Sequence, residues 1–325
     1  MSYTKRAILP VSPDEAFALI TEPERLRRWQ TVSAVVDLRA GGSYQWTVTP
    51  GHIAAGTFRE VEPGRRIVFG WGWDGSADLP YDGSTVTVTV EPTEGGSLVT
   101  LVHEGLTEEQ ARSHAEGWDH YFARLERLAA TGDAGPDEWA YAPENLTPVV
   151  AAEAALAVLQ PILRNLTAED RPRPTPCAEF TCHELAEHLL TSLGQLGAMA
   201  GATVPDSAAG SLEDRVSTLA GRAIDAWRTV DLAGTVPGPG GVQMPASFAA
   251  GILPLELTLH GWDLAQGSGQ SVHISDELVD YLRGLAEKIV PGGRGSSFAD
   301  EATPAGDATA IDRLAAFSGR TPLAA

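Results

Sequence analysis

The sequence predicts a two-domain protein, with an α+β domain at residues 1–131, a linker at residues 132–141 and an all-α domain at residues 142–325. The first observation is length, since domains usually hold ~100–200 residues and this chain has 325. Apolar and polar residues alternate with period two at several places in the first domain, which is typical of strands. In the second domain Ala, Leu and Glu recur at helical spacing instead. The stretch between the domains is rich in chain-breaking residues, as linkers are.

The first domain begins with a strand, followed by two short helices, a run of strands and one long helix. Residues 13–29 predict a helix that is capped by Ser12 and divided by Pro23, because proline breaks a helix interior. Residues 85–90 alternate Thr and Val and form the clearest strand. A long helix over residues 107–129 closes the domain. Because a sheet must bury its apolar face against another layer, we expect a curved antiparallel sheet wrapped against the terminal helix.

The second domain is predicted to be a helical bundle. Its five longer helices are expected at residues 147–165, 181–199, 211–229, 246–266 and 275–290. The Gly- and Pro-rich residues 236–241 are expected to form a mobile loop just before the fourth of these helices. The last residues, 291–325, form a small extension with one short helix at residues 309–317.

Composition narrows the class of protein. Hydrophobic residues make up 43% of the chain, which is enough apolar material for two cores. The net charge of -20 repels phosphate backbones and anionic membranes, so we expect neither nucleic-acid nor membrane partners. No apolar run approaches the ~20 residues that span a bilayer, and the first ten residues have no apolar signal core. The only two cysteines, Cys177 and Cys182, form no disulfide framework, so we expect a cytoplasmic protein.

A concave sheet closed by a helix leaves a cavity between them, and large aromatic and imidazole side chains are placed to line it. A few polar tips on aromatic walls suit a small apolar ligand. The alternative is that these side chains are core filler. The candidates lie on strand-like segments, at the end of the last strand and on one face of the closing helix; they are Trp46, Trp71, Trp73, His103, His114, Trp118 and Tyr121.

Several segments of this domain carry a family resemblance. They are ALITEPERL at residues 18–26, DLRAGG at 37–42, GTFREV at 56–61, HEGL at 103–106 and GW at 117–118. The domain resembles the START-like (SRPBCC) superfamily, and within it the homologues of the heat-shock-protein ATPase activator. The resemblance implies a helix-grip fold with a hydrophobic cavity for a small-molecule ligand. It implies little about chemistry, because fold alone does not give function.

The second domain contains a candidate metal site. His188 shares a helix face with leucines, whereas His183 lies about 140° around the helix and is the weaker candidate. Glu256 and His260 are four residues apart on another helix and project from one face. A buried carboxylate is costly alone, and a divalent cation would satisfy it together with the imidazoles. The alternative is a hydrogen-bonded Glu–His pair with an unrelated core histidine.

A second resemblance supports the metal site. The segments are PTPC at residues 174–177, LAEHL at 185–189, ELTLHGWDLA at 256–265 and DRLAAFSGR at 312–320. They resemble the actinobacterial branch of the DinB-like superfamily that includes mycothiol-dependent maleylpyruvate isomerase. The resemblance implies a four-helix bundle with a divalent metal held by His188, Glu256 and His260, zinc first and nickel or iron as alternatives. Mycothiol would be a cosubstrate. One departure is Phe180, where the family commonly has tryptophan.

Five further residues are candidates for supporting roles. Asp263 follows His260 by three residues and either orients it or lies on the surface. Arg222, Arg228 and Arg320 either hold a substrate carboxylate or form surface salt bridges. Cys177 is either a thiolate near a helix start or a small buried apolar residue.

Two functions follow from these patterns. The first is a metal-dependent enzyme acting on a small apolar or aromatic metabolite, a thiol-dependent transferase or isomerase in detoxification or secondary metabolism. A hydrolase, lyase or cyclase belongs to the same class. The second is a non-catalytic ligand-binding or co-chaperone-like protein whose helical bundle is stabilised by metal. Substrate, metal identity and oligomeric state are left open by the sequence.

Overall fold

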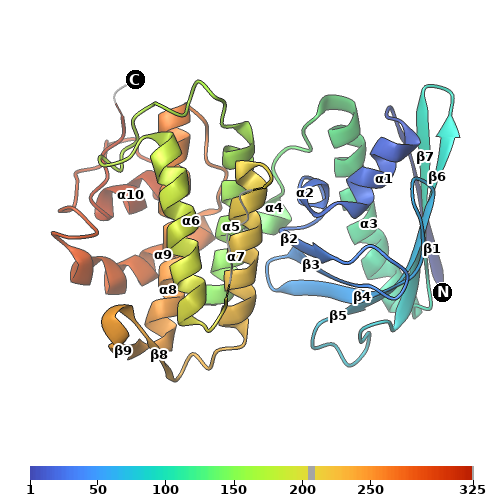
Figure 1. The fold of residues 1–325 in the computed structure, drawn as a ribbon, viewed down its shortest axis with the longest axis horizontal. Helices are drawn as coiled ribbons and strands as arrows, with labels where there is room; N and C mark the ends of the chain where they lie inside the picture. The colour runs from blue at the N-terminus through green and yellow to red at the C-terminus, as the bar shows by residue number, and fades with distance from the viewer. Residues whose placement is uncertain (204–208, 324–325) are drawn as a thin grey trace. The chain divides into compact units, whose positions relative to one another are not determined.

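The computed structural model describes residues 1–203 and 209–323. The chain divides into two compact units, Met1–Asp137 and Glu138–Ala325 (Figure 1). The division falls inside the stretch predicted as a linker. Part of that stretch forms the short helix α4, Glu138–Tyr141.

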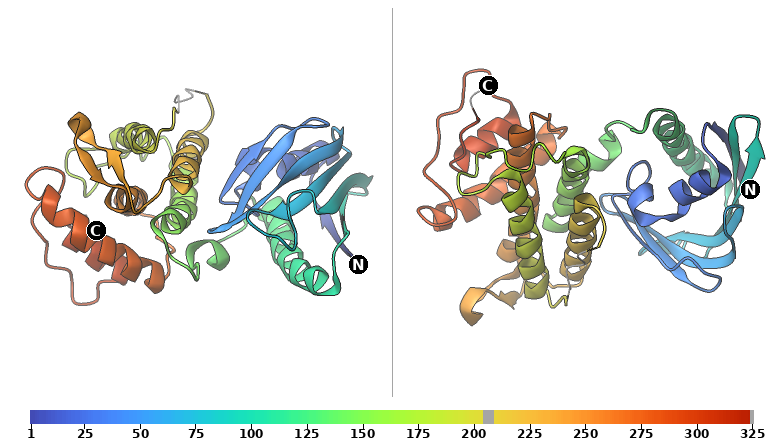
Figure 2. Two further views of the ribbon diagram at one scale, coloured as in Figure 1. Left: turned by 90° about the horizontal axis from the view of Figure 1, so that it is seen from below. Right: turned by 45° about the horizontal axis from the view of Figure 1, so that its top comes forward.

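The first unit is an α+β fold built on one antiparallel sheet of seven strands, ordered β1-β7-β6-β5-β4-β3-β2. Figure 2 shows the sheet curving and the long helix α3 lying against it. Two short helices connect the first strand to the rest. The elements are β1 Ser2–Leu9, α1 Pro13–Thr21, α2 Pro23–Leu26, β2 Ser33–Val36, β3 Ser43–Thr49, β4 His52–Glu62, β5 Arg66–Trp73, β6 Ser84–Thr93, β7 Gly96–Glu104 and α3 Glu108–Thr131.

Local sequence explains these elements. In β6, Val86, Val88 and Val90 are buried while the threonines between them are partly exposed, as period-two alternation predicts. Thr107 begins α3 with a capping box, and Gly132 ends it at a φ of 82°, a conformation that glycine adopts without steric cost. The register of the sheet shifts between Thr47 and Thr49 and between Phe58 and Glu60. Such bulges bend strands, which gives the sheet its concave face.

The second unit is mainly helical. The helix α8 is buried on nearly all sides and packs against α5, α6 and α9. A helix that is apolar all round belongs in the centre of a bundle. The elements are α5 Pro148–Asn165, α6 Cys182–Met199, α7 Leu212–Arg228, β8 Thr235–Pro237, η1 Pro239–Gly241, β9 Gln243–Pro245, α8 Ala246–Ser268, α9 Asp276–Ile289, η2 Val290–Gly293 and α10 Ala310–Phe317.

The expected mobile loop before α8 is instead a short antiparallel hairpin, β8–β9. Gly240 and Gly241 have φ values of 68° and 79°, which allow the chain to reverse here. The helical periodicity that predicted an all-α domain does not detect strands of three residues. The second unit is therefore helical with one small hairpin.

Among the residues that the structure describes, no helix has both the length and the apolar character needed to cross a membrane.

Candidate metal centre and ligand cleft

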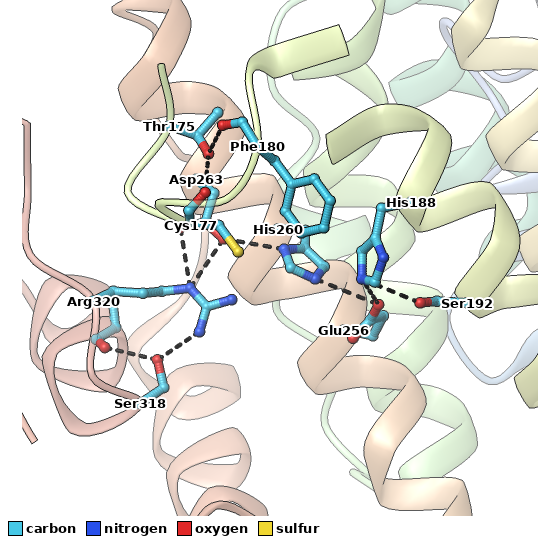
Figure 3. Close-up of polar contacts among 11 residues, drawn as sticks. Thr175, Cys177, Phe180, His188, Ser192, Glu256, His260, Asp263, Ser318 and Arg320 are labelled. Atoms are coloured by element: carbon cyan, nitrogen blue, oxygen red, sulfur yellow. Dashed lines mark hydrogen bonds and ion pairs between the residues drawn. The ribbon is translucent and has the colours of Figure 1, made fainter. Parts of the chain in front are cut away.

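Helices α6 and α8 bring His188, Glu256 and His260 together (Figure 3). Thr181 and Glu184 form a capping box that fixes the start of α6, and His188 follows two turns later. Glu256 and His260 lie one turn apart on α8. The distance from His260 Nε2 to Glu256 Oε1 is 3.4 Å, and that from His188 Nε2 to the same oxygen is 3.6 Å. Sixty-eight residues of sequence therefore separate side chains that are neighbours in space.

The three donors fit a divalent cation. One nitrogen of each histidine and one Glu256 oxygen lie within 4.8 Å of one another. Glu256 Oε1 is buried and accepts no hydrogen bond of normal length. A buried carboxylate oxygen that accepts no hydrogen bond is costly, and a cation between the three donors would satisfy it. Two imidazoles and one carboxylate also leave coordination positions open, as catalytic zinc sites do.

His260 is held by a buried carboxylate. Its Nδ1 lies 3.0 Å from Asp263 Oδ2, and Asp263 is fully buried. Because the carboxylate accepts, the proton of a neutral His260 stays on Nδ1 and Nε2 is free to act as a ligand. Burial would lower the pKa of His260, but the carboxylates of Glu256 and Asp263 outweigh burial and raise that pKa to about 9. Burial would raise the pKa of Glu256, but the charge of His260 holds it well below its usual range.

The loop before α6 covers one side of the site. The ring of Phe180 stacks on His188 with 4.8 Å between centroids and 26° between planes. Thr175 supports this loop, since its hydroxyl donates to the carbonyl oxygens of Cys177 and Phe180. The side chain of His188 is nevertheless 37% exposed, so the loop leaves part of its ring open to solvent. The sequence places His188 on a helix face with leucines, and the structure buries its side chain only in part.

Cys177 lies on the other side of His260. Its sulfur is within 4.8 Å of donor atoms of His260 and Asp263. Burial, with a smaller contribution from Asp263, raises the pKa of the Cys177 thiol to about 11. The group is therefore a thiol rather than a thiolate at neutral pH. This disfavours its interpretation as an activated nucleophile.

Of the three arginines considered for a substrate carboxylate, only Arg320 reaches this region. Its Nε donates to both oxygens of Asp263, at 3.0 and 2.9 Å. Arg228 pairs instead with Glu153 and Asp225. Arg222 is exposed on α7. None of them presents an uncommitted guanidinium to the three donors.

The first unit has a cleft between its sheet and α3, with about 350 Å³ of space that is partly open to solvent. Five of the predicted cavity residues line it, together with four that the sequence analysis did not single out. The prediction rested on large aromatic and imidazole side chains, so it could not identify the small and polar residues of the lining. The lining consists of Gln30, Val48, Trp71, Trp73, Ser113, His114, Gly117, Trp118 and Tyr121.

Two predicted cavity residues lie elsewhere. Trp46 lines a second, more apolar hollow, which shares Gln30 and Trp118 with the cleft. His103 is completely buried and contacts the rings of Trp71 and Trp118. It therefore packs behind two of the aromatic side chains that line the cleft.

The polar atoms of the aromatic wall bond to one another. His114 Nε2 accepts from Trp71 Nε1 at 3.1 Å and from Trp73 Nε1 at 3.2 Å. Trp118 Nε1 donates to His103 Nδ1 at 3.2 Å. Each histidine uses its second nitrogen as a donor, to the Gln110 carbonyl at 2.7 Å and to the Ser84 hydroxyl at 2.8 Å. The cleft thus offers ring faces with few free polar atoms, which suits an apolar or aromatic ligand.

Residues 10–130 match the family described as activator of Hsp90 ATPase homolog 1-like protein. The first unit is an Hsp90 ATPase activator-like domain of the START-like superfamily. Its curved seven-stranded sheet and long closing helix match the helix-grip fold that the sequence predicted.

Two uncharacterised proteins from two strains of Mycobacterium tuberculosis are 30% identical to the chain over 181 residues, covering 54% of the chain and 99% of each protein. The chain belongs to the same family as these mycobacterial proteins. Because the first unit ends at Asp137, an alignment of 181 residues extends into the second unit.

Two solved structures are similar to the chain. An activator-like protein of Rhizobium etli is 37% identical, with a TM-score of 0.37 and coverage of 45% of this chain and 91% of that protein. CalU16 of Micromonospora echinospora is 26% identical, with a TM-score of 0.35 and coverage of 40% and 77%.

Proposed function

We propose that the protein is a metal-dependent enzyme whose centre is formed by His188, Glu256 and His260. The observation that carries this proposal is the buried Glu256 oxygen that lies between two imidazole nitrogens and accepts no hydrogen bond. A structural zinc site is usually closed by four protein ligands, whereas this set has three and one partly exposed side. The arrangement therefore favours chemistry over simple stabilisation.

A divalent cation held there, zinc first and nickel or iron as alternatives, would supply Lewis acidity toward a substrate oxygen or sulfur. The chain supplies the rest. Asp263 keeps the proton of His260 on Nδ1, and Phe180 stacks on His188 and limits the motion of its ring. The exposed edge of His188 marks the side from which substrate enters.

We extend this proposal to a reaction that uses a small thiol as cosubstrate. The sequence resemblance to mycothiol-dependent maleylpyruvate isomerase implies thiol-dependent transferase or isomerase chemistry on the DinB-like bundle. Cys177 lies outside the set formed by His188, Glu256 and His260, so the reacting sulfur would come from a bound small thiol. Cobalt-loaded protein should then develop near-ultraviolet charge-transfer absorption when a small thiol is added.

The metal content of the protein tests the centre itself. Elemental mass spectrometry should find one equivalent of metal in the wild type and a loss of metal in His188→Ala, Glu256→Gln and His260→Ala. His183→Ala is the matched control, because His183 is exposed on the same helix and should keep full occupancy. Wild-type protein that stays free of metal after incubation with zinc, nickel and iron would contradict the proposal.

The first unit would bind the apolar or aromatic metabolite in its cleft. Gly117 supports this role, because it lies in the interior of α3, where glycine costs about 1 kcal/mol relative to alanine. A Cβ atom at Gly117 would meet nothing within 4 Å. The absence of a side chain at this position thus keeps the cleft open.

Substitutions at Gly117 should separate stability from binding. Gly117→Ala is expected to stabilise the first unit by about 1 kcal/mol in thermal unfolding. Gly117→Phe should fill the cleft and weaken binding of the fluorescent probe naphthol by roughly tenfold, or ~1.4 kcal/mol. Gly284→Phe, at a helical glycine of the second unit that also has open space, is the control. Equal probe affinity in Gly117→Phe and wild type would exclude the cleft as the binding site.

A second candidate function is co-chaperone activity without catalysis. The match of residues 10–130 to the Hsp90 ATPase activator-like family favours it. Stimulation of a bacterial Hsp90 ATPase by the full chain, unchanged in His260→Ala, would support this function over the enzyme.

A further inference from the structure

A polar chain links His260 to the C-terminal segment of the protein. Asp263, buried beside His260, receives two contacts from Arg320 Nε at 3.0 and 2.9 Å. These two residues are 57 positions apart in sequence, and Arg320 follows the short helix α10. Arg320 is itself only 8% exposed. A buried ion pair of this kind is costly to desolvate, so its presence next to a candidate ligand needs a physical reason.

Contacts at the end of α10 fix the position of the Arg320 guanidinium. Arg320 Nη1 donates to the Ser318 hydroxyl at 3.0 Å, and that hydroxyl donates to the Ala315 carbonyl oxygen at 2.7 Å. The backbone N–H of Arg320 also donates to the Ala315 carbonyl oxygen, at 3.0 Å. The end of α10 therefore determines where the guanidinium lies, and Figure 3 shows this chain reaching from Ser318 to His260.

We propose that Asp263 and Arg320 are positioning residues of the metal centre, so that the C-terminal segment is part of the site. Asp263 holds His260 with Nε2 toward Glu256, and Arg320 holds Asp263 in place. This inference rests on the proposed function, because it assigns a role to groups that surround its ligands. Carboxylates that orient a ligand histidine are typical partners of this kind.

Arg320 also sets the charge of the site. It neutralises Asp263, so that, with His188 and His260 neutral as ligands, Glu256 would be the carboxylate whose charge the cation balances. A divalent cation bound there would keep one net positive charge, which matches an anionic donor such as a thiolate or a carboxylate. Without Arg320, the second carboxylate would cancel that charge.

The test compares zinc affinity, measured by chelator competition, in the full-length wild type and in variants. The double variant Asp263→Leu with Arg320→Met removes both charges at similar volume, a change that buried ion pairs often tolerate in folding. We expect its zinc affinity to fall by roughly 10- to 100-fold. The single variant Arg320→Lys keeps the charge but not the planar fork and should lose less. Arg313→Gln, at an exposed arginine of α10, is the control and should bind as the wild type does.

Cobalt absorption gives a readout independent of affinity. Wild-type and double-variant proteins saturated with cobalt should differ in the position or intensity of their visible bands, because His260 is no longer held. A folded double variant with zinc affinity within twofold of wild type and the same cobalt spectrum would overturn the inference and leave the proposed function intact. Wild-type protein that binds neither metal would overturn both.

Discussion

Saturating zinc is expected to stabilise the second unit by about 4 kcal/mol when its free concentration is a thousandfold above the dissociation constant. The reason is linkage, because the cation binds a site that exists only when α6 and α8 are folded together. For a unit of this size, that free energy corresponds to a rise of roughly 10 °C in the unfolding midpoint. The first unit contains none of the three donors and should unfold at an unchanged temperature.

Hydrogen exchange followed by mass spectrometry can assign the effect to one unit. Zinc should slow exchange in peptides from α6 and α8 and leave peptides from β6 and β7 unchanged. Glu256→Gln is the matched variant, since it keeps the shape of the side chain but provides a much weaker ligand. Equal protection of both units by zinc, or the same protection in Glu256→Gln, would mean that the stabilising metal binds elsewhere.

The helices of the second unit could be located from sequence because their starts carry capping residues. Thr147, Thr181, Ser211, Ser275 and Thr309 each accept a hydrogen bond at the N-cap position. These bonds depend only on local sequence. Helix α8 begins at Ala246 as predicted although its N-cap Pro245 forms no side-chain cap, whereas the hairpin β8–β9 before it was missed. Strands of three residues are too short for periodicity to appear.

The candidate site was predictable only in part. The spacing of Glu256 and His260 places both on one face of a helix, which is a local inference. Nothing in the spacing of His188 shows that α6 packs its side chain against them, and the family resemblance supplied that step. The contact between Asp263 and Arg320 depends on the path of the chain after α10. The sequence alone therefore could not distinguish Arg320 from the other two candidate arginines, Arg222 and Arg228.

The same limit applies to the cleft in the first unit. Alternation along β5 predicts that Trp71 and Trp73 face the helix, as they do. Trp46 on β3 also faces inward but lines the neighbouring hollow. Which hollow a side chain reaches depends on sheet curvature and bulges, which the sequence pattern does not give.

The first unit is expected to lose stability as the pH falls below about 6.5. Burial lowers the pKa of His103 to about 3, with a smaller contribution from His114, and burial also lowers the pKa of His114. In the unfolded chain both histidines regain the ordinary value of about 6.5. Between these values the unfolded state binds protons that the folded state does not. Stability is therefore fully present above pH 6.5 and is lost progressively toward pH 3.

For His103 alone, the loss at pH 5 amounts to about 2 kcal/mol, since each unit of pH below 6.5 costs ~1.4 kcal/mol. Urea unfolding of the full chain at pH 7 and pH 5, followed by exchange in peptides from β7 and α3, measures it. His103→Gln should reduce the pH dependence, because the amide can accept from Trp118 and donate to Ser84 without titrating near pH 6. His52→Gln, at an exposed strand position, is the control and should retain the wild-type dependence. An unchanged slope in His103→Gln would show that protonation of this buried imidazole does not drive the acid sensitivity, and that other groups of the unit titrate in its place.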